Sequence, residues 1–169
     1  MTKPFVAILM GSDSDLPLMQ STIEILKSFE IRCEVKVTSA HRTPAATHAY
    51  VTDAETRGCK VFICAAGLAA HLAGAVAGIT TRPIIGVPVD CGPLQGHDAL
   101  LSTVMMPAGV PVATVAIGSA GAKNAAYLAA QILAVADDEL AAKVKENRAE
   151  NARAVIAKDA ALQEKLASL

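Results

Sequence analysis

The sequence predicts an α/β fold in which helices cover both faces of a parallel, five-stranded sheet. Short apolar runs typical of buried strands recur along the chain, and helix-compatible segments separate them. A long segment rich in Ala, Glu, Lys and Leu follows the last of these runs. Because repeated strand and helix units give parallel strands, and parallel strands buried on both faces form continuous apolar runs, these observations favour a three-layer α/β/α architecture.

The five expected strands are short. The first, "FVAILM", precedes the polar loop "GSDSD", and the second, "CEVKV", precedes the loop "SAHRTP". The third and fourth are "VFIC" and "PIIGV", and the fifth is "VATVAI". In residue numbers the strands are expected at 5–10, 33–37, 61–64, 83–87 and 112–117.

Helices are expected between these strands. Apolar residues at helical spacing over 19–29 predict the first helix. For the second, over residues 45–57, Thr43 is the expected N-cap, Pro44 belongs to the first turn, and Gly58 ends the helix.

At 169 residues the chain is long enough for one domain with a substantial core and too short for two. We expect a single domain over 1–169, with its core at about 5–136 and a long C-terminal helix at about 138–166. No strand follows this helix, so we expect it to reach a neighbouring subunit.

The composition argues against several classes of partner. Lys and Arg total 15 against 16 Asp and Glu, and only 3% of residues are aromatic, so no basic surface or base-stacking platform for nucleic acid is visible. The cysteines form no Cys-x-x-Cys pair, and no charged-then-apolar signal precedes the first strand. These features favour a reducing, cytoplasmic location.

Formal charge is sparse between residues 61 and 136, where only Arg82, Asp90, Asp98 and Lys123 carry it. We therefore expect most of this stretch to be buried.

The uncharged run 61–81 is long enough to cross a bilayer, but His71 and several glycines dilute it, and prolines divide the segments after it into short pieces. No membrane span is predicted. The interior of one small domain is limited, so this much Ala, Gly and Val is better explained by surfaces packed against other copies. We predict a homo-oligomer.

Ligands of open parallel sheets bind beyond the carboxyl ends of the strands, where the strand order reverses. In the first loop at this edge, Gly11 allows a sharp turn, Ser12 and Ser14 can donate to a phosphate, and Asp15 can accept from a ribose hydroxyl. The same residues are typical of a helix N-cap, and from this loop alone the structural explanation is favoured.

The second loop supplies a hydroxyl from Ser39 and a guanidinium from Arg42, both suited to phosphate. His41 lies between them, and histidine is the side chain that ordinarily titrates near neutral pH. A role as a structural hydrogen-bond donor is an equally good explanation of His41 at this point.

The third loop, 65–74, consists mostly of Ala and Gly around the imidazole of His71. Such small residues let the backbone approach a ligand closely. Ala69 and Ala70 are better explained as a packed helix start, whereas His71 would be costly to bury unpaired. Together the three loops indicate phosphate donors, a ribose acceptor and one or two imidazoles beside a small apolar cavity.

Other chemistries lack their motifs. No G-x-x-x-x-G-K-[ST] loop and no G-x-G-x-x-G fingerprint occurs, which argues against the use of a nucleoside triphosphate. His41 and His48 have no His or Cys partner at metal-binding spacing, so no protein-built metal site is expected. No G-x-S-x-G nucleophile motif is present. His48 and His97 are expected to be surface or structural residues.

Four motifs carry a resemblance to a known family: "GSDSD", "SAHRTP", "AAHL" and "PVATVAIGSAGAKNAA", in this order and at these spacings. Between about residues 6 and 134 the chain resembles the class I N5-carboxyaminoimidazole ribonucleotide mutases, the PurE family of bacterial purine biosynthesis. The resemblance implies a flavodoxin-like domain assembled as a homo-octamer. It also implies an isomerase that moves a carboxylate from the exocyclic nitrogen to carbon 4 of the imidazole, by decarboxylation and recarboxylation, without cofactor or metal.

The resemblance also implies roles for individual residues. His41 would be the general acid and base, His71 would line the carboxylate or CO2 pocket, and Asp15 would hold the ribose. The phosphate would be held by Ser12, Ser14, Ser39 and Arg42. The remaining substrate contacts would come from Ala40, Gly67, Ala69, Ala70 and Leu72.

Three positions depart from the family pattern: Leu68 replaces a usual Gly, Ala73 a usual Pro, and Met105 a usual Gln. The first two should change the shape of the CO2 pocket. A related class makes the same product directly from aminoimidazole ribonucleotide and CO2, but it usually has Lys in place of Arg42 and lacks "AAHL". A non-catalytic nucleotide-binding module of the same fold is the alternative from another functional class.

Overall fold

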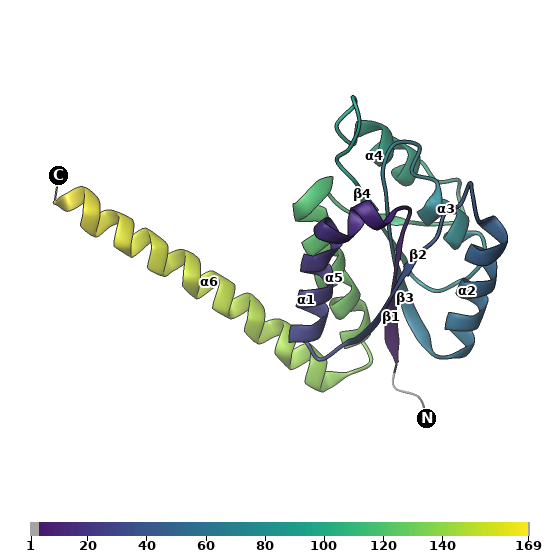
Figure 1. The fold of residues 1–169 in the computed structure, drawn as a ribbon. Coiled ribbons are helices and arrows are strands. Elements are labelled where there is room, and N and C mark those ends of the chain that lie inside the picture. Colours follow the sequence, from purple (N-terminus) through teal and green to yellow (C-terminus); the bar gives the residue numbers. More distant parts are fainter. Residues whose placement is uncertain (1–3, 169) are drawn as a thin grey trace.

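The structure, a computed structural model, describes residues 4–168, so residues 1–3 and 169 of the expected domain lie outside the described residues. It confirms the predicted three layers around a parallel five-stranded sheet (Figure 1). The strands are β1 (Phe5–Met10), β2 (Arg32–Val37), β3 (Cys59–Ala66), β4 (Ile84–Pro88) and β5 (Ala113–Thr114). Their spatial order is β2-β1-β3-β4-β5, which is the flavodoxin-like order.

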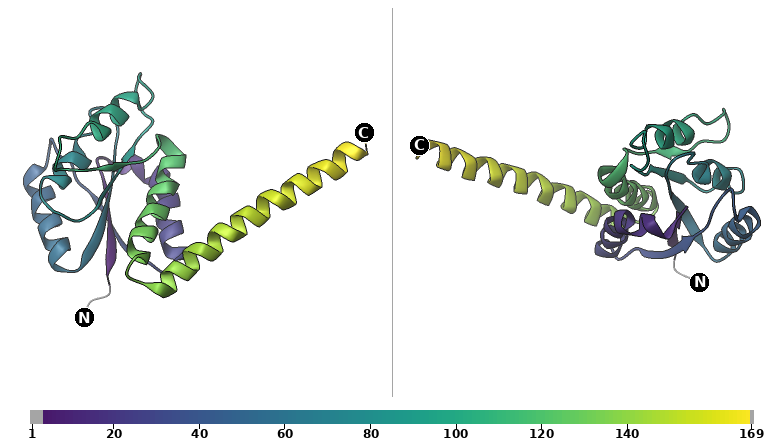
Figure 2. Two further views of the ribbon diagram at one scale, coloured as in Figure 1. Left: turned by 180° about the vertical axis from the view of Figure 1, so that it is seen from behind. Right: turned by 45° about the horizontal axis from the view of Figure 1, so that its top comes forward.

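Helices cover both faces of the sheet (Figure 2). Helices α1 (Leu16–Ser28) and α5 (Gly118–Ala134) pack on one face, and α2 (Pro44–Thr56) and α3 (Leu72–Ala77) pack on the other. A short 3-10 turn, η1 (Asp13–Asp15), precedes α1, and α4 (His97–Val104) lies beside β4 and β5.

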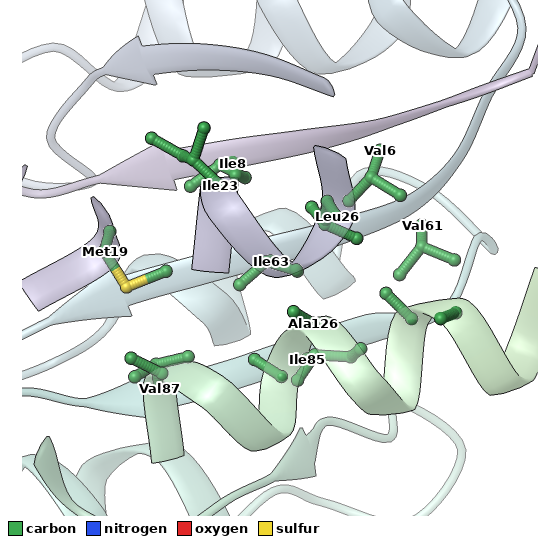
Figure 3. Packing of buried hydrophobic residues seen from close by; sticks show 14 of the residues in the cluster. Val6, Ile8, Met19, Ile23, Leu26, Val61, Ile63, Ile85, Val87 and Ala126 are labelled. Carbon is green, nitrogen blue, oxygen red and sulfur yellow. The ribbon is translucent and has the colours of Figure 1, made fainter. Parts of the chain in front are cut away.

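Alternate strand residues face opposite layers, as the two-residue period of a strand requires. On β1, Val6 and Ile8 pack toward α1 and α5, whereas Phe5 and Ala7 pack toward α2 and α3. Figure 3 shows the first of these clusters, in which small residues of α5 such as Ala126 bring that helix close to the sheet. Burial of both faces explains why β1 is a continuous apolar run.

The second helix begins and ends close to its predicted bounds. Pro44 is its first residue, and Gly58, with φ of +100°, follows the C-cap residue in the left-handed conformation that favours glycine. Thr43 occupies the N-cap position, but its hydroxyl accepts from the backbone N–H of Ser39 at 2.9 Å instead of from the helix. This hydrogen bond shapes the loop between β2 and α2.

The fifth strand is shorter than predicted. Only Ala113 and Thr114 pair with β4, because the chain then turns into α5 through Gly118, whose φ is +71°. A Cβ on Gly121 would lie 1.6 Å from the carbonyl oxygen of Ala116, so the helix starts in direct contact with this segment. Residues 115–117 therefore form the entry to α5 and not the end of a strand.

Within the single chain, the expected burial of residues 61–136 does not extend to residues 91–120, which include α4 and are mostly at least partly exposed. Leu101 is 60% exposed and Met105 is 78% exposed, and Val104 between them is also exposed. The low formal charge of this segment thus reflects an apolar surface as well as an interior. We refer to these three residues as the α4 face.

The last helix, α6 (Asp138–Ala167), is the predicted long C-terminal helix. It projects away from the sheet and its covering helices (Figures 1 and 2). Asp137 caps it by accepting from the N–H of Leu140 at 3.0 Å, and Leu140 is its one buried residue among those described. No helix within residues 4–168 is long and apolar enough to cross a membrane.

Candidate functional site

A cavity of about 460 Å³ lies at the carboxyl ends of β1, β2 and β3, where the three predicted loops meet. Strand β1 lies between β2 and β3. The chain therefore passes from β1 to β2 on one flank of β1 and then back to β3 on the opposite flank. This reversal separates the loops and leaves a crevice between them.

The loop after β1 is both a helix cap and a wall of the cavity. The Ser12 hydroxyl accepts from the N–H of Ser14 at 3.2 Å, and the Asp15 carboxylate accepts from the N–H of Ser12 at 3.2 Å. These reciprocal bonds form a capping box. The structural explanation offered by the sequence is therefore correct, and the same residues still line the cavity.

Asp15 is only 8% exposed, and this burial raises the pKa of its carboxyl group. The hydrogen bond from the Ser12 N–H acts in the opposite direction and favours the charged form. The carboxylate is thus held in place by the backbone, and its second oxygen is available to a ligand hydroxyl.

The loop after β2 holds Ser39 and Arg42 through the backbone. The N–H of Arg42 donates to the Ser39 hydroxyl oxygen at 3.1 Å, which leaves the Ser39 proton available for a ligand. The Arg42 guanidinium reaches the loop after β1 and donates to the carbonyl oxygen of Gly11 at 3.2 Å. Within residues 4–168, Arg42 has no carboxylate within ion-pair distance, so most of its donors are available to an anion.

The two histidines of the site form a pair. Nε2 of His41 and Nδ1 of His71 lie 2.7 Å apart, and the ring planes meet edge to face at 81°. One ring nitrogen must donate and the other accept, so a single hydrogen lies between the two imidazoles. Both residues are exposed to the cavity, and His71 also stands at the N-cap position of α3. The arrangement can accept, hold and return a proton.

The structure brings all but one of the predicted site residues to the cavity. The residues that line it as expected are Ser12, Ser14, Asp15, Ser39, Ala40, His41, Arg42, Gly67, Ala69, His71 and Leu72. The exception is Ala70, which is buried, and its carbonyl oxygen accepts from the Thr103 hydroxyl at 3.4 Å. Ala70 therefore does not line the cavity, because α4 packs on this residue.

Four further residues line the cavity that were not among the predicted site residues: Gly11, Ala66, Leu68 and Cys91. Ala66 is the last residue of β3, and Gly11 directly follows the last residue of β1, so both lie at the carboxyl edge of the sheet. Cys91 belongs to the loop after β4, and the pairing of β4 with β3 brings that loop to the site. Knowledge of the strand order would have identified it.

The donor set suits an anionic ligand better than a cation. Hydroxyls, a guanidinium and N–H groups surround the cavity, and among the described residues that line it the buried Asp15 is the one carboxylate. No group of three His, Cys, Asp or Glu side chains in the described part of the chain is arranged to hold a metal ion. The site is therefore equipped for phosphate binding and for proton transfer by imidazole.

Comparisons with known proteins connect this site to a family. The AIR carboxylase family matches residues 5–154. The N5-carboxyaminoimidazole ribonucleotide mutase of Thermotoga maritima is 52% identical over 161 residues, which cover 95% of this chain and 93% of the relative. The mutase of Bacillus subtilis is 51% identical over 154 residues, which cover 91% of this chain and 95% of the relative.

Solved structures agree with this relationship. The crystal structure of Treponema denticola PurE matches with a TM-score of 0.85 at 33% identity, over 94% of this chain and 98% of that one. Because the family match and the two mutase relatives each extend over most of the sequence, the chain belongs to the AIR carboxylase family.

Proposed function

We propose that this chain is an N5-carboxyaminoimidazole ribonucleotide mutase that acts in purine biosynthesis. The observation that carries the proposal is the contact between His41 and His71 at 2.7 Å, inside a cavity whose other polar groups suit a nucleotide phosphate. Mutase relatives whose sequences are 52% and 51% identical to nearly the whole chain support the same activity.

Residues of the two polar loops bind different parts of the substrate. The Arg42 guanidinium and the hydroxyls of Ser12, Ser14 and Ser39 bind the phosphate, because they combine charge with several donors. The Asp15 carboxylate accepts from a ribose hydroxyl. The aminoimidazole ring then lies toward the Ala and Gly residues of the loop after β3, which leave room for it.

The chemistry requires one group that first gives a proton and then takes one. The bond between the exocyclic nitrogen and its carboxylate breaks, CO2 leaves, and the electron pair stays on the nitrogen, which takes a proton from His41. Carbon 4 then attacks CO2 with the electron pair of the electron-rich ring, and a carbon–carbon bond forms. The hydrogen on carbon 4 leaves as a proton to His41, so the reaction is a net isomerisation.

His71 supports this cycle through its contact with His41. The shared hydrogen stays on Nε2 of His41 and is accepted by Nδ1 of His71, whether or not Nδ1 of His41 carries the proton that is exchanged with the substrate. The pair thus keeps the His41 ring in one orientation through both proton transfers.

We further propose that the whole chain forms a single domain and that eight copies assemble as a homo-octamer in the cytoplasm. The α4 face and the exposed apolar residues of α6, among them Val155 and Ile156, offer surfaces for contacts between copies. Helix α6 extends well beyond its own sheet and can reach a neighbouring subunit (Figure 2).

The test is product formation by the purified protein without ATP from two substrates: N5-carboxyaminoimidazole ribonucleotide, and aminoimidazole ribonucleotide with bicarbonate. The proposal expects rapid conversion of the first and little of the second. Efficient use of the second at modest bicarbonate would identify a direct carboxylase. Tight nucleotide binding with no turnover of either would leave a binding module of this fold.

A further inference from the structure

Leu68 has a backbone conformation that leucine rarely adopts. Its φ is +54°, in the left-handed region where a side chain other than that of glycine is crowded by its own backbone. The side chain is 52% exposed, so burial in a core does not account for this conformation. Residues held in this way concentrate at functional sites, and Leu68 lines the cavity described above.

The loop after β4 provides the space for the Leu68 side chain. A Cβ on Gly92, whose own φ is +72°, would lie 2.6 Å from Cδ2 of Leu68. The preceding residues show the opposite arrangement, with the glycine in the loop after β3 and the side chain in the loop after β4. A Cβ on Gly67 would lie 2.1 Å from Sγ of Cys91. Each loop thus presents a glycine to a side chain of the other. We call these four residues the interlock.

The interlock forms an apolar wall of the cavity. Leu68 and Cys91 both line it, and Leu68 lies three residues before His71, whose ring contacts His41. The proton-transfer pair therefore has a nonpolar wall nearby, in a loop otherwise made of Ala and Gly. A glycine at position 68 would adopt the same backbone without strain but would remove this wall.

We propose that Leu68 closes the carboxylate end of the cavity and retains released CO2 until carbon 4 captures it. This inference rests on the proposed mutase function. CO2 is uncharged and offers little to a hydrogen-bond donor, so a site holds it mainly by closing off its exit and excluding water. The interlock supplies such a barrier, since its shape depends on contacts between two loops.

The experiment measures how often CO2 escapes. Unlabelled N5-carboxyaminoimidazole ribonucleotide is converted in buffer that contains 13C-bicarbonate and carbonic anhydrase, and mass spectrometry gives the labelled fraction of the product. Breakdown without enzyme is subtracted. The variants are Leu68→Ala, which removes the wall, Leu68→Met, which preserves most of its volume, and Leu94→Ala, a matched change at a 58% exposed leucine outside the cavity lining.

The inference expects Leu68→Ala to raise the labelled fraction by roughly fivefold, because escape then competes with recapture. Leu68→Met and Leu94→Ala should remain close to the wild type. A labelled fraction unchanged in Leu68→Ala would overturn the inference, as would an equal rise in Leu94→Ala. Reduced oligomer mass in Leu68→Ala by light scattering, without extra label, would also overturn it and would assign Leu68 to a contact between copies.

The outcome for the wild type separates this inference from the function on which it rests. If the wild type forms product with little label, the mutase function holds and only the Leu68 comparison remains to be decided. If the wild type forms no product from this substrate, the proposed function fails, and the inference fails with it.

Discussion

Helix α2 has an arginine at each end, and the two guanidinium groups have opposite surroundings. At the C-terminal end, Arg57 donates to both oxygens of Glu34, at 2.6 and 2.8 Å, and to Asp53 at 2.7 Å. It also lies over the Phe5 ring, 5.2 Å from the centroid. At the N-terminal end, Arg42 donates to a single backbone oxygen, that of Gly11. Within residues 4–168 it has no acidic partner.

The difference shows how to distinguish a structural arginine from one that serves a ligand. Carboxylates saturate the planar fork of Arg57, so this residue ties α2 to β2. The fork of Arg42 remains open toward a cavity that holds hydroxyl donors as well. Substitutions at and beside the two arginines test this contrast, and we order them by the size of the change that we expect.

The largest effect is expected from His41→Asn, beside Arg42. This substitution removes the proton-transfer group and should lower kcat by about 10²- to 10⁴-fold. Both His41 and its partner His71 are exposed, so the melting temperature should stay unchanged. Steady-state kinetics and thermal unfolding measure the two quantities. An active His41→Asn enzyme would show that proton transfer takes place elsewhere.

Arg42→Ala should mainly weaken substrate binding. Loss of hydrogen bonds to a charged phosphate costs about 1.5–3 kcal/mol, which raises KM by roughly 10- to 100-fold. Arg42→Lys keeps the charge but not the planar fork, so its KM should lie between those of the wild type and the alanine variant. A KM unchanged in Arg42→Ala would remove Arg42 from the phosphate site.

Arg57→Ala is the matched substitution at the other end of the helix. It removes the ion pairs of Arg57 with Glu34 and Asp53 and leaves Glu34 with Arg32 alone, so the melting temperature should fall by a few degrees while KM stays near that of the wild type. Differential scanning calorimetry and the same kinetic assay test both parts. If Arg57→Ala raised KM as much as Arg42→Ala does, the contrast between the two ends would be lost.

The smallest effect concerns pH and Glu34. The hydrogen bonds from Arg57 lower the pKa of this carboxyl group below its ordinary value of 4.5. A lowered pKa in the folded state gives stability that is present above the ordinary pKa and is lost as the pH falls through the lowered one. Glu34→Gln should therefore reduce the melting temperature at neutral pH, and the difference from the wild type should disappear in acid. A difference independent of pH would exclude this linkage.

The sequence predicted the surroundings of Arg42, at the N-terminal end of α2, better than those of Arg57 at its C-terminal end. Ser39, His41 and Arg42 follow a strand in a parallel sheet, and the carboxyl ends of such strands meet at one edge, so their meeting with the loop after β1 could be anticipated. The pair of Glu34 and Arg57 depends on how α2 lies against β2. No local pattern in the sequence encodes that packing.

The remaining differences have similar causes. Ala70 was expected at the ligand but does not line the cavity, because it packs against α4, a helix far along the chain. Cys91 reaches the cavity because β4 pairs with β3, which the order of elements along the chain does not reveal. No pattern of residue types in the sequence indicates the left-handed conformation of Leu68.

The most direct test of the central claim, that the cavity at the N-terminal end of α2 is where the carboxylate is transferred, follows the carboxylate itself. N5-carboxyaminoimidazole ribonucleotide labelled with 13C in its carboxylate is mixed with wild-type or His41→Asn protein in unlabelled bicarbonate without ATP, and 13C NMR reports where the label resides. We predict that the wild type moves the label to carbon 4 and that His41→Asn does not. Equal transfer by both proteins, or none by the wild type, would contradict the claim.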